Sequence, residues 1–488
     1  MAVVAPISFA QRIRDLAGQD PDRPAVTCGD RSLTRAELDR AATSLGHDLR
    51  AGGVRVGDMV TVALPNSVDW FVAFAACWKI GAIPQPVSAR LPVRELTAIV
   101  ELADAAAVLG VEEATFPGRR CLPVGYTAPP VDEPLPDVVS PAWKAPTSGG
   151  STGRPKLIVS GDPSLFETDG PVPLLISPGG CMVMPGPLYH NGPLIWSWQA
   201  LLWGDHVVVL PRFDAEQTLD ALDRHGADIV YLVPTMMKRI WSLGEQVRGR
   251  YDLSALRVVW HLAEPCPAWL KDAWVEWLGP ERIYELYGGT EGQASTIISG
   301  EEWLEHRGSV GRPARGTVTI RDEDGRDLPP RQTGEVWLKS ERDTPTYRYV
   351  GAEPRRSADG WESLGDMGWL DEDGYLYLGD RASDMILTGG SNVYPAEVEA
   401  AILEHPLVHS CAVIGLPDEE RGNNVHAIVQ ADGALLPEPE LLAFVAERLV
   451  RYKVPRSVEY VSEPLRDDAG KVRRAALRAE RVGPVAAG

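Results

Sequence analysis

The sequence has few of the features that mark a disulfide-stabilised or membrane-spanning protein. Its six cysteines are scattered and form no CxxC pair, which argues against a disulfide framework or a zinc site. It has no run of about 18 apolar residues, and its N-terminus lacks the basic and long apolar regions of a signal peptide. We therefore expect a cytoplasmic protein with reduced thiols and no membrane insertion.

Positive charge is also scarce. The chain has 48 Lys and Arg residues against 68 Asp and Glu residues, a formal net charge of −20. Such a chain is a poor candidate for binding nucleic acid or an anionic membrane, because both carry negative charge themselves. Any anionic ligand must instead be held by local donors.

The chain is long enough for several folding units and shows α/β patterning. At roughly 150 residues per domain, 488 residues suggest about three units. Residues 32–53 have the periodicity of an amphipathic helix, for which we predict Ser32 as the N-cap. Helical and strand patterns alternate there and again over residues 205–290, which indicates a mostly parallel sheet. The 15 Trp residues fit either core packing or an apolar pocket.

The patterning changes twice in the second half of the chain. Residues from about 305 to 380 have short strand patterns with Asp-Gly and Pro-rich turns, which predict a small β-barrel or β-subdomain. From residue 381, helices and strands form a compact α+β pattern. We therefore predict an N-terminal domain over residues 1–380 and a C-terminal domain over residues 381–488.

The strongest local signal is the segment TSGGSTGRPK, residues 147–156. Its glycines allow the backbone to approach an anion closely, its hydroxyls can donate, and Arg154 and Lys156 supply positive charge. It is not a Walker A loop, because Lys156 follows Pro155 and precedes Leu157. Taken alone, the segment also fits a flexible surface loop.

This segment resembles the phosphate loop of the adenylate-forming superfamily, which includes acyl-CoA synthetases, luciferases and peptide-synthetase adenylation domains. Five further segments resemble that superfamily in the expected order: PLYHNGP (187–193), YELYGGTEG (284–292), SLGDMG (363–368), DRASDMILTGGSNVYPAEVE (380–399) and DDAGKVRR (467–474). The resemblance implies a large N-terminal domain of two αβαβα subdomains plus a small β-barrel, and a small mobile α+β C-terminal domain. It also implies that ATP and a carboxylate form an acyl-adenylate, which coenzyme A then converts to a thioester.

The resemblance assigns a role to each segment. Glu291 would meet the Mg²⁺ that travels with ATP, and Lys471 would stabilise charge on the carboxylate and the α-phosphate. Tyr287 would stack near the adenine, and Asp366 would accept the ribose hydroxyls. The residues implied for ATP or AMP are Thr147, Ser148, Gly149, Gly150, Ser151, Thr152, Gly153, Lys156, Ala263, Glu264, Pro265, Tyr287, Gly288, Gly289, Thr290, Asp366 and Arg381.

The same resemblance implies an acyl pocket, a thiol tunnel and a hinge. His190 would close the acyl pocket and move to admit pantetheine, although a buried core histidine is the alternative. The C-terminal domain would rotate about Ser383, and Gly389 and Gly390 would then line the tunnel for coenzyme A. The pocket residues would be His190, Trp196, Met236, Met237 and Gly288, which favour a bulky apolar acid.

One departure from the family pattern affects the reaction itself. Leu262 and Glu264 stand where relatives have small residues, in the segment that borders the adenine. A carboxylate facing the nucleotide would disfavour ATP more than a less charged acyl-adenylate. A Glu264 side chain that points away would have no such effect. The hinge also differs, because relatives have Asp or Lys at the position of Ser383.

We therefore predict an ATP-dependent acid:CoA ligase of the acyl-CoA synthetase branch, which would use ATP, Mg²⁺, coenzyme A and a bulky apolar acid. The resemblance allows a homodimer. One alternative is a variant that only thioesterifies a preformed adenylate, as Glu264 would favour. A second, an amino-acid-activating domain, lacks an Asp soon after PLYHNGP until Asp205. A third, a non-enzymatic binding protein, does not explain the retained Lys471, Glu291 and Asp366.

Overall fold

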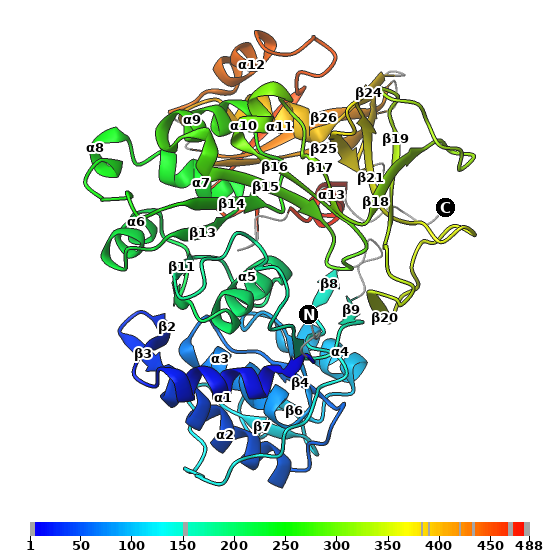
Figure 1. Cartoon of the computed structure of the whole chain (residues 1–488). Helices are drawn as coiled ribbons and strands as arrows, with labels where there is room; N and C mark the ends of the chain where they lie inside the picture. Colours follow the sequence, from blue (N-terminus) through cyan, green and yellow to red (C-terminus); the bar gives the residue numbers. More distant parts are fainter. Residues whose placement is uncertain are drawn as a thin grey trace.

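The computed structural model describes residues 5–149, 155–381, 384–388, 391–418, 421–431, 435–466 and 472–482. Two largely parallel sheets flanked by helices form the body of the molecule, with an antiparallel sheet at one side and a smaller α+β unit formed by the end of the chain (Figure 1). This is the α/β class that the alternating patterns predict. Within the described residues, no helix is long and apolar enough to cross a membrane.

The larger sheet has nine strands in the order β17-β16-β15-β14-β13-β11-β12-β2-β3. Its central strands are parallel, and all residues of β13 and β14 are buried, as expected for strands covered on both faces. The carboxyl ends of β13, β14 and β15 therefore meet at one edge. The strands are β2 (Pro24–Cys28), β3 (Arg31–Thr34), β11 (Cys181–Met184), β12 (His206–Val209), β13 (Ile229–Leu232), β14 (Val258–Leu262), β15 (Ile283–Gly288), β16 (Ser295–Ser299) and β17 (Arg312–Arg315).

Helices of the central part cover this sheet and supply loops at the same edge. Helix α5 begins directly after His190, and α7 begins directly after Val233. The helices are α5 (Asn191–Leu202), α6 (Ala215–Arg224), α7 (Pro234–Trp241), α8 (Glu245–Arg248), α9 (Ala268–Leu278) and α10 (Gly300–Glu305).

The second sheet is fully parallel, in the order β5-β4-β6-β7. Helix α2 begins after Thr34, whose hydroxyl accepts from the Glu37 N–H in a capping box. The prediction of Ser32 as the cap is wrong, because the β2–β3 hairpin extends through Thr34. The elements are β4 (Met59–Val62), β5 (Ile83–Pro86), β6 (Ala107–Leu109), β7 (Arg120–Leu122), α1 (Phe9–Gln19), α2 (Arg35–Ala51), α3 (Val68–Lys79) and α4 (Val93–Ala103).

A small three-stranded sheet, in the order β20-β9-β8, holds the ends of the predicted phosphate loop. Strands β8 (Thr147–Gly149) and β9 (Pro155–Ser160) pair antiparallel and form the two arms of a hairpin. Strand β20 (Tyr347–Val350) pairs with the other side of β9. The phosphate-loop hairpin is thus supported by a strand from a distant part of the chain. A further small pair joins β1 (Ile7–Ser8) and β10 (Leu165–Phe166).

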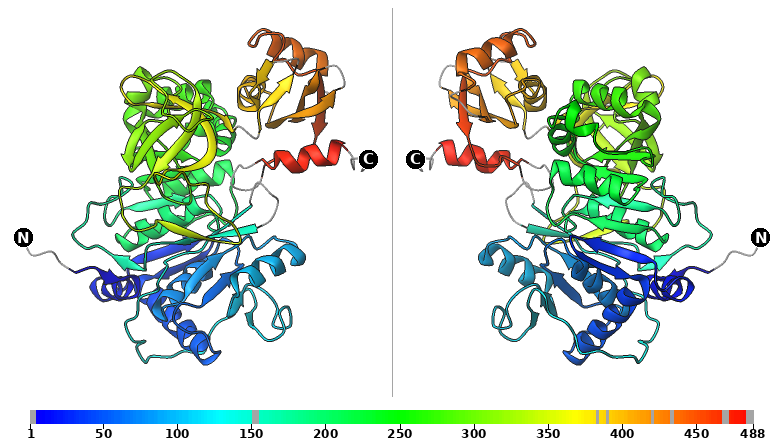
Figure 2. Two further views of the ribbon diagram at one scale, coloured as in Figure 1. Left: turned by 90° about the vertical axis from the view of Figure 1, so that its right-hand side faces the viewer. Right: turned by 90° about the vertical axis from the view of Figure 1, so that its left-hand side faces the viewer.

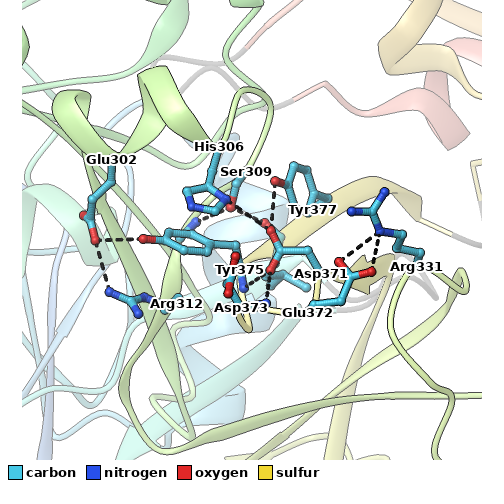
Figure 3. Close-up of polar contacts among 12 residues, drawn as sticks. Glu302, His306, Ser309, Arg312, Arg331, Asp371, Glu372, Asp373, Tyr375 and Tyr377 are labelled. Carbon is cyan, nitrogen blue, oxygen red and sulfur yellow. Dashed lines mark hydrogen bonds and ion pairs between the residues drawn. The ribbon is translucent and has the colours of Figure 1, made fainter.

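The predicted β-subdomain is an antiparallel sheet in the order β18-β19-β21-β22, comprising β18 (Thr317–Arg321), β19 (Gly334–Lys339), β21 (Glu362–Leu370) and β22 (Leu376–Arg381). A polar cluster fastens its β21–β22 turn to the larger sheet (Figure 3). The Tyr375 hydroxyl donates to Glu302 at 3.1 Å, and His306 Nδ1 lies 3.2 Å from the Asp371 carboxylate. Burial raises the pKa of Asp371, but hydrogen bonds, led by that from the Tyr375 N–H, together lower it.

The end of the chain forms a separate α+β unit beside the main body (Figure 2). Its sheet has the order β24-β23-β26-β25, with β27 paired to β26. In the described residues it contacts the main body through Lys238 of α7, whose Nζ donates to Leu403 O at 2.6 Å and Val408 O at 2.7 Å. The elements are β23 (Ile386–Thr388), β24 (Ser391–Val393), α11 (Pro395–Leu403), β25 (Ser410–Asp418), β26 (Gly422–Gln430), α12 (Glu438–Ala446), β27 (Ser457–Val461) and α13 (Arg474–Val482).

Candidate active site

Glu291 lies where the end of β15, the phosphate-loop hairpin and β20 meet. Its side chain is buried, and its Oε1 accepts a hydrogen bond from the Tyr349 hydroxyl at 2.6 Å. The ammonium of Lys156 lies 3.6 Å from the same oxygen and 3.8 Å from the centre of the Tyr349 ring. Burial, followed by the hydrogen bond to Glu291, raises the pKa of Tyr349, so this phenol is a donor at neutral pH. The structure thus brings together the predicted metal ligand and the predicted phosphate-binding lysine.

Gly289, two residues before this carboxylate, leaves space for the Glu291 and Leu364 side chains. A Cβ on Gly289 would lie 2.5 Å from Leu364 Cδ1 and 2.9 Å from Glu291 Oε2. Both distances are shorter than normal contacts, so any side chain there would displace the Glu291 carboxylate or Leu364. Gly289 therefore allows the turn between β15 and Glu291 to pass close to β21. Gly288 and Thr290 occupy the positions on either side of it.

Tyr287 and Asp366 come from different sheets and are hydrogen-bonded to each other. The Tyr287 hydroxyl donates to Asp366 Oδ2 at 2.8 Å, which joins β15 to β21. Asp366 is also paired by strand register with Arg381 of β22. The residues predicted for the adenine and the ribose therefore lie next to one another, on the side of β15 that carries Glu291.

The Glu264 carboxylate is turned towards the start of helix α7. Its Oε2 accepts hydrogen bonds from the Thr235 N–H at 3.1 Å and from the Thr235 hydroxyl at 2.8 Å. An acidic group in this place is favourable, because the N-terminus of a helix has free N–H groups and a partial positive charge. The preceding Ala263 has φ of 75°, a left-handed conformation that is unusual for alanine, and Pro265 is exposed.

His190 is the residue before helix α5 and is partly buried. Its N–H donates to Pro187 O at 3.1 Å, and its ring lies 4.2 Å from that of Tyr189, centre to centre. Trp196, further along α5, is buried and packs edge-on against Tyr231 of β13 and Trp260 of β14. Aromatic rings thus fill the space between α5 and the sheet.

Met236 and Met237 are also buried, in the hydrophobic core on the inner side of α7. Of the predicted acyl-pocket residues, therefore, His190 and Gly288 lie nearest the surface, while Trp196 and the two methionines lie in the packed interior.

The remaining predicted residues divide into two groups. Thr147 accepts a hydrogen bond from the Gln85 amide at 2.6 Å, and Ser148 and Gly149 lie beside it in β8. The others lie outside the described residues: Gly150, Ser151, Thr152, Gly153, Ser383, Gly389, Gly390 and Lys471.

The described residues contain no group of three His, Cys, Asp or Glu side chains that could hold a metal ion. Magnesium that accompanies a nucleotide needs only one or two carboxylates, because phosphates and water supply its other ligands. Glu291 fits that requirement, since it is a buried carboxylate beside the phosphate-loop hairpin.

Two residues that contact the predicted ones were not expected from the sequence. Tyr349 holds the Glu291 carboxylate, and Thr235 holds that of Glu264. Alternation along the YRYV segment indicates only that Tyr347 and Tyr349 share one face of a strand. No local signal shows that this strand pairs with β9.

The chain is similar to known proteins over most of its length. The model of the AMP-binding enzyme family matches residues 13–348, and that of the AMP-binding enzyme C-terminal domain matches residues 397–471. A feruloyl-CoA synthase from Amycolatopsis sp. is 33% identical, over 95% of this chain and 96% of its own. A 2-succinylbenzoate–CoA ligase from Bacillus cereus is 29% identical, over 94% of this chain and 95% of its own.

A solved structure of the o-succinylbenzoate CoA synthetase from Bacillus subtilis, in complex with its acyl-adenylate intermediate, is also similar. It is 25% identical, with a TM-score of 0.82, over 99% of this chain and 100% of its own. The same protein has been solved with ATP and a magnesium ion, with a TM-score of 0.79 at 25% identity over 97% of this chain and 100% of its own.

The chain therefore belongs to the AMP-binding enzyme family, in the acyl-CoA ligase branch of the adenylate-forming superfamily. Within that branch it is an ATP-dependent acyl-CoA synthetase.

Proposed function

We propose that the protein converts a bulky apolar carboxylic acid to its coenzyme A thioester through an acyl-adenylate, with rotation of the C-terminal domain between the two half-reactions. The convergence of Glu291, Lys156 and Tyr349 beside the phosphate-loop hairpin carries the proposal, because a buried carboxylate next to a cation is what binding of ATP with Mg²⁺ would require. A cytoplasmic location and a homodimer remain predictions.

Each half of the nucleotide would be held by a different part of the site. Lys156 and the hairpin donors would bind the phosphates, while Asp366 would accept the ribose hydroxyls beside Tyr287. Glu291 would hold Mg²⁺, which neutralises phosphate charge when it is bound. Lys471, the cation of the adenylation step by resemblance, would then stabilise charge on the carboxylate and the α-phosphate.

The proposed acid is supported by what lies beneath His190. Trp196, Tyr231 and Trp260 form a buried aromatic cluster between α5 and the sheet, so the interior next to His190 is apolar, which suits an apolar acid better than a charged one. The relatives are named for feruloyl and succinylbenzoate groups, both of which contain a benzene ring. We therefore place aromatic acids first in a panel of bulky apolar acids.

The direction of Glu264 favours a full ligase over a variant limited to the second half-reaction. Its carboxylate is bound by the Thr235 N–H and hydroxyl, so the positive end of α7 offsets its charge. We expect Glu264→Gln to change the KM for ATP by less than about threefold at low and at high salt, since a screened charge has little long-range effect. A marked improvement at low salt alone would instead show that Glu264 opposes ATP.

A two-part assay tests the proposal. Acid-dependent ATP–pyrophosphate exchange is measured without coenzyme A, and thioester formation is then measured from synthetic acyl-adenylates. We expect Lys471→Ala to lower exchange by about 10²–10³-fold and to spare the second reaction. Lys453→Ala is the matched control, because Lys453 is a C-terminal-domain lysine paired with Glu397. Thioester formation without any exchange would support the half-reaction alternative, and equal loss of both reactions in Lys471→Ala would contradict the role of Lys471.

A further inference from the structure

Lys144 is a buried cation close to three segments of the site. It lies three residues before Thr147, and only 6% of its surface is exposed. Its backbone is fixed by pairing, since Ser160 N–H donates to Lys144 O at 3.0 Å. The side chain passes the Trp143 ring at 4.7 Å and donates from Nζ to Asn191 Oδ1. Lys144 thus connects the segment that precedes β8 with the first residue of α5.

Among the described residues, no carboxylate forms an ion pair with Lys144. The two carboxylates that influence it, Asp162 and Glu291, each have another cation, Arg342 and Lys156 respectively. Its only hydrogen-bond acceptor in the described part of the chain is the neutral Asn191 amide. Burial lowers the pKa of Lys144 to about 7, against the opposing effect of Asp162 and Glu291. A buried ammonium without an anionic partner is costly, so its retention calls for a use.

The contact with Asn191 fixes one side of His190. On the other side, the Asn66 amide donates to Gly186 O at 2.9 Å, and its carbonyl accepts from Leu188 N–H at 2.9 Å. Among the contacts of the described residues, Asn66 holds the part of the segment before His190 and Lys144 holds the part after it, and of these two side chains only Lys144 carries charge.

The first turn of α5 has little freedom to move elsewhere. A Cβ on Gly192 would lie 2.2 Å from Tyr231 Oη, so the helix start rests directly on β13. Loss of the Lys144 contact would therefore turn Asn191 and His190 outward, because β13 blocks the inward direction.

We propose that Lys144 is a positioning residue for acid binding, which acts through Asn191 to hold His190 over the acyl site. The inference rests on the proposed ligase function. Its charge strengthens the hydrogen bond to Asn191, and the same charge favours an anionic carboxylate arriving at this edge. When the acid is bound, its negative charge supplies the partner that Lys144 lacks among the described residues.

The test compares Lys144→Met with Lys79→Met in acid-dependent pyrophosphate exchange. Lys79 is a matched control, because it is equally buried in the N-terminal part of the chain but is paired with Asp39 at 2.6 Å, in helices α3 and α2. We expect Lys144→Met to raise the KM for the acid about tenfold or more and to change the KM for ATP much less. Lys79→Met should lower the melting temperature and leave both KM values unchanged.

Two further measurements separate positioning from a structural role. If Lys144 acts through Asn191 and His190, the effects of Lys144→Met and His190→Ala on the KM for the acid should be strongly non-additive in a double-mutant cycle. Wild-type kcat/KM for the acid should fall above pH 7, and Asn191→Asp should move that fall to higher pH, because a carboxylate raises the pKa of a neighbouring ammonium.

The possible failures can be told apart. A wild-type protein without acid-dependent exchange contradicts the proposed function. An active wild type, with Lys144→Met and Lys79→Met alike in KM, contradicts the role of Lys144. If Lys144→Met does not fold, an unchanged pH profile in Asn191→Asp contradicts that role on its own.

Discussion

Glu291 is held by side chains that the chain brings from two distant segments. Tyr349 donates to its carboxylate, Lys156 faces the same oxygen, and the Thr346 hydroxyl donates to Glu291 O at 2.8 Å. The carboxylate is therefore fixed in position before any nucleotide arrives. A fixed ligand loses less conformational entropy on binding, which is the usual basis of preorganised sites.

We expect Tyr349→Phe to slow adenylation about tenfold, because it removes one hydrogen bond to a charged group without changing the packing. The measurement is kcat for pyrophosphate exchange as a function of Mg²⁺ concentration, where a loosened Glu291 should also raise the Mg²⁺ requirement.

Tyr347→Phe is the control for that experiment. Its hydroxyl donates to Glu362 at 2.7 Å and does not touch Glu291. This variant should be less stable, because a buried carboxylate loses a donor, but its Mg²⁺ requirement should match that of the wild type. Identical kinetics in the two variants would show that Tyr349 does not hold Glu291 in a functional way.

The sequence predicts which residues belong to the site better than it predicts what holds them. The motif around residues 284–292 predicted Glu291 after a strand and a Gly-Gly turn, and the structure has it just beyond β15, although that strand is only partly buried. The direction of the Glu264 side chain was left open, because it depends on the neighbouring start of α7 and not on the local pattern. Tyr349 and Lys144 were missed for the same reason, since their partners lie far away in the chain.

At the scale of elements, the hairpin of β8 and β9 depends on β20 for its third strand. The backbone after β9 lies close to the backbone before β20, because the Gly161 N–H donates to Thr346 O at 2.8 Å. A Cβ on Gly161 would lie 2.1 Å from Pro345 O, a distance that only glycine can avoid. This contact determines how closely β20 approaches β9.

We expect Gly161→Ala to separate β20 from β9 and so to disturb both Tyr349 and Lys156. The result should be a lower melting temperature together with weaker ATP binding, measured by thermal unfolding with and without ATP and Mg²⁺. Gly18→Ala is the matched control, because a Cβ on Gly18 of helix α1 meets nothing within 4 Å and alanine favours helices. Normal stabilisation of Gly161→Ala by ATP would contradict this dependence.

Local patterns were sufficient for the parallel strands and insufficient for such pairings. Continuous apolar runs such as those at residues 229–232 and 258–262 identified buried strands, because both faces of a parallel sheet are covered. The β20–β9 pairing has no such signal. Even the N-cap of α2 was predicted at Ser32, whereas the structure has it at Thr34, because the extent of the preceding hairpin decides where the helix begins.

At the scale of the whole molecule, Lys238 links α7 to the C-terminal unit. Its buried ammonium donates to the carbonyl of Leu403, the last residue of α11, where helix carbonyls lack partners, and to that of Val408, between α11 and β25. Burial lowers the pKa of Lys238 to about 8. The N-terminus of the same helix binds the Glu264 carboxylate, so α7 contacts both the loop after β14 and the C-terminal unit.

We expect Lys238→Met to loosen this arrangement of the two parts, because two carbonyls lose their donor. A pair of fluorophores on the two parts should show lower energy transfer in Lys238→Met and no change in Lys453→Met, a control confined to the C-terminal unit. Unchanged transfer in Lys238→Met would contradict this role.

The same link should depend on pH. A free lysine has a pKa of about 10.4, whereas docked Lys238 has a pKa of about 8. Between these two pH values, the form with separated parts therefore binds more protons than the docked form. Raising the pH through this range therefore favours docking, and energy transfer in the wild type should increase from pH 8 to pH 10. Lys238→Met should lack this increase.

The pairing of β20 with β9 also has a consequence for synthesis of the chain. Ser160 pairs with Tyr347, so 347 − 160 = 187 residues separate the partners. At about 5–20 residues per second, a ribosome needs roughly 10 to 40 s to make that stretch. Throughout that time the nascent chain carries the phosphate-loop segment without its third strand and without Tyr349. Nucleotide binding therefore cannot assist folding of the emerging N-terminal sheets, and a chain released before residue 347 should accumulate as a folded core that ATP does not stabilise.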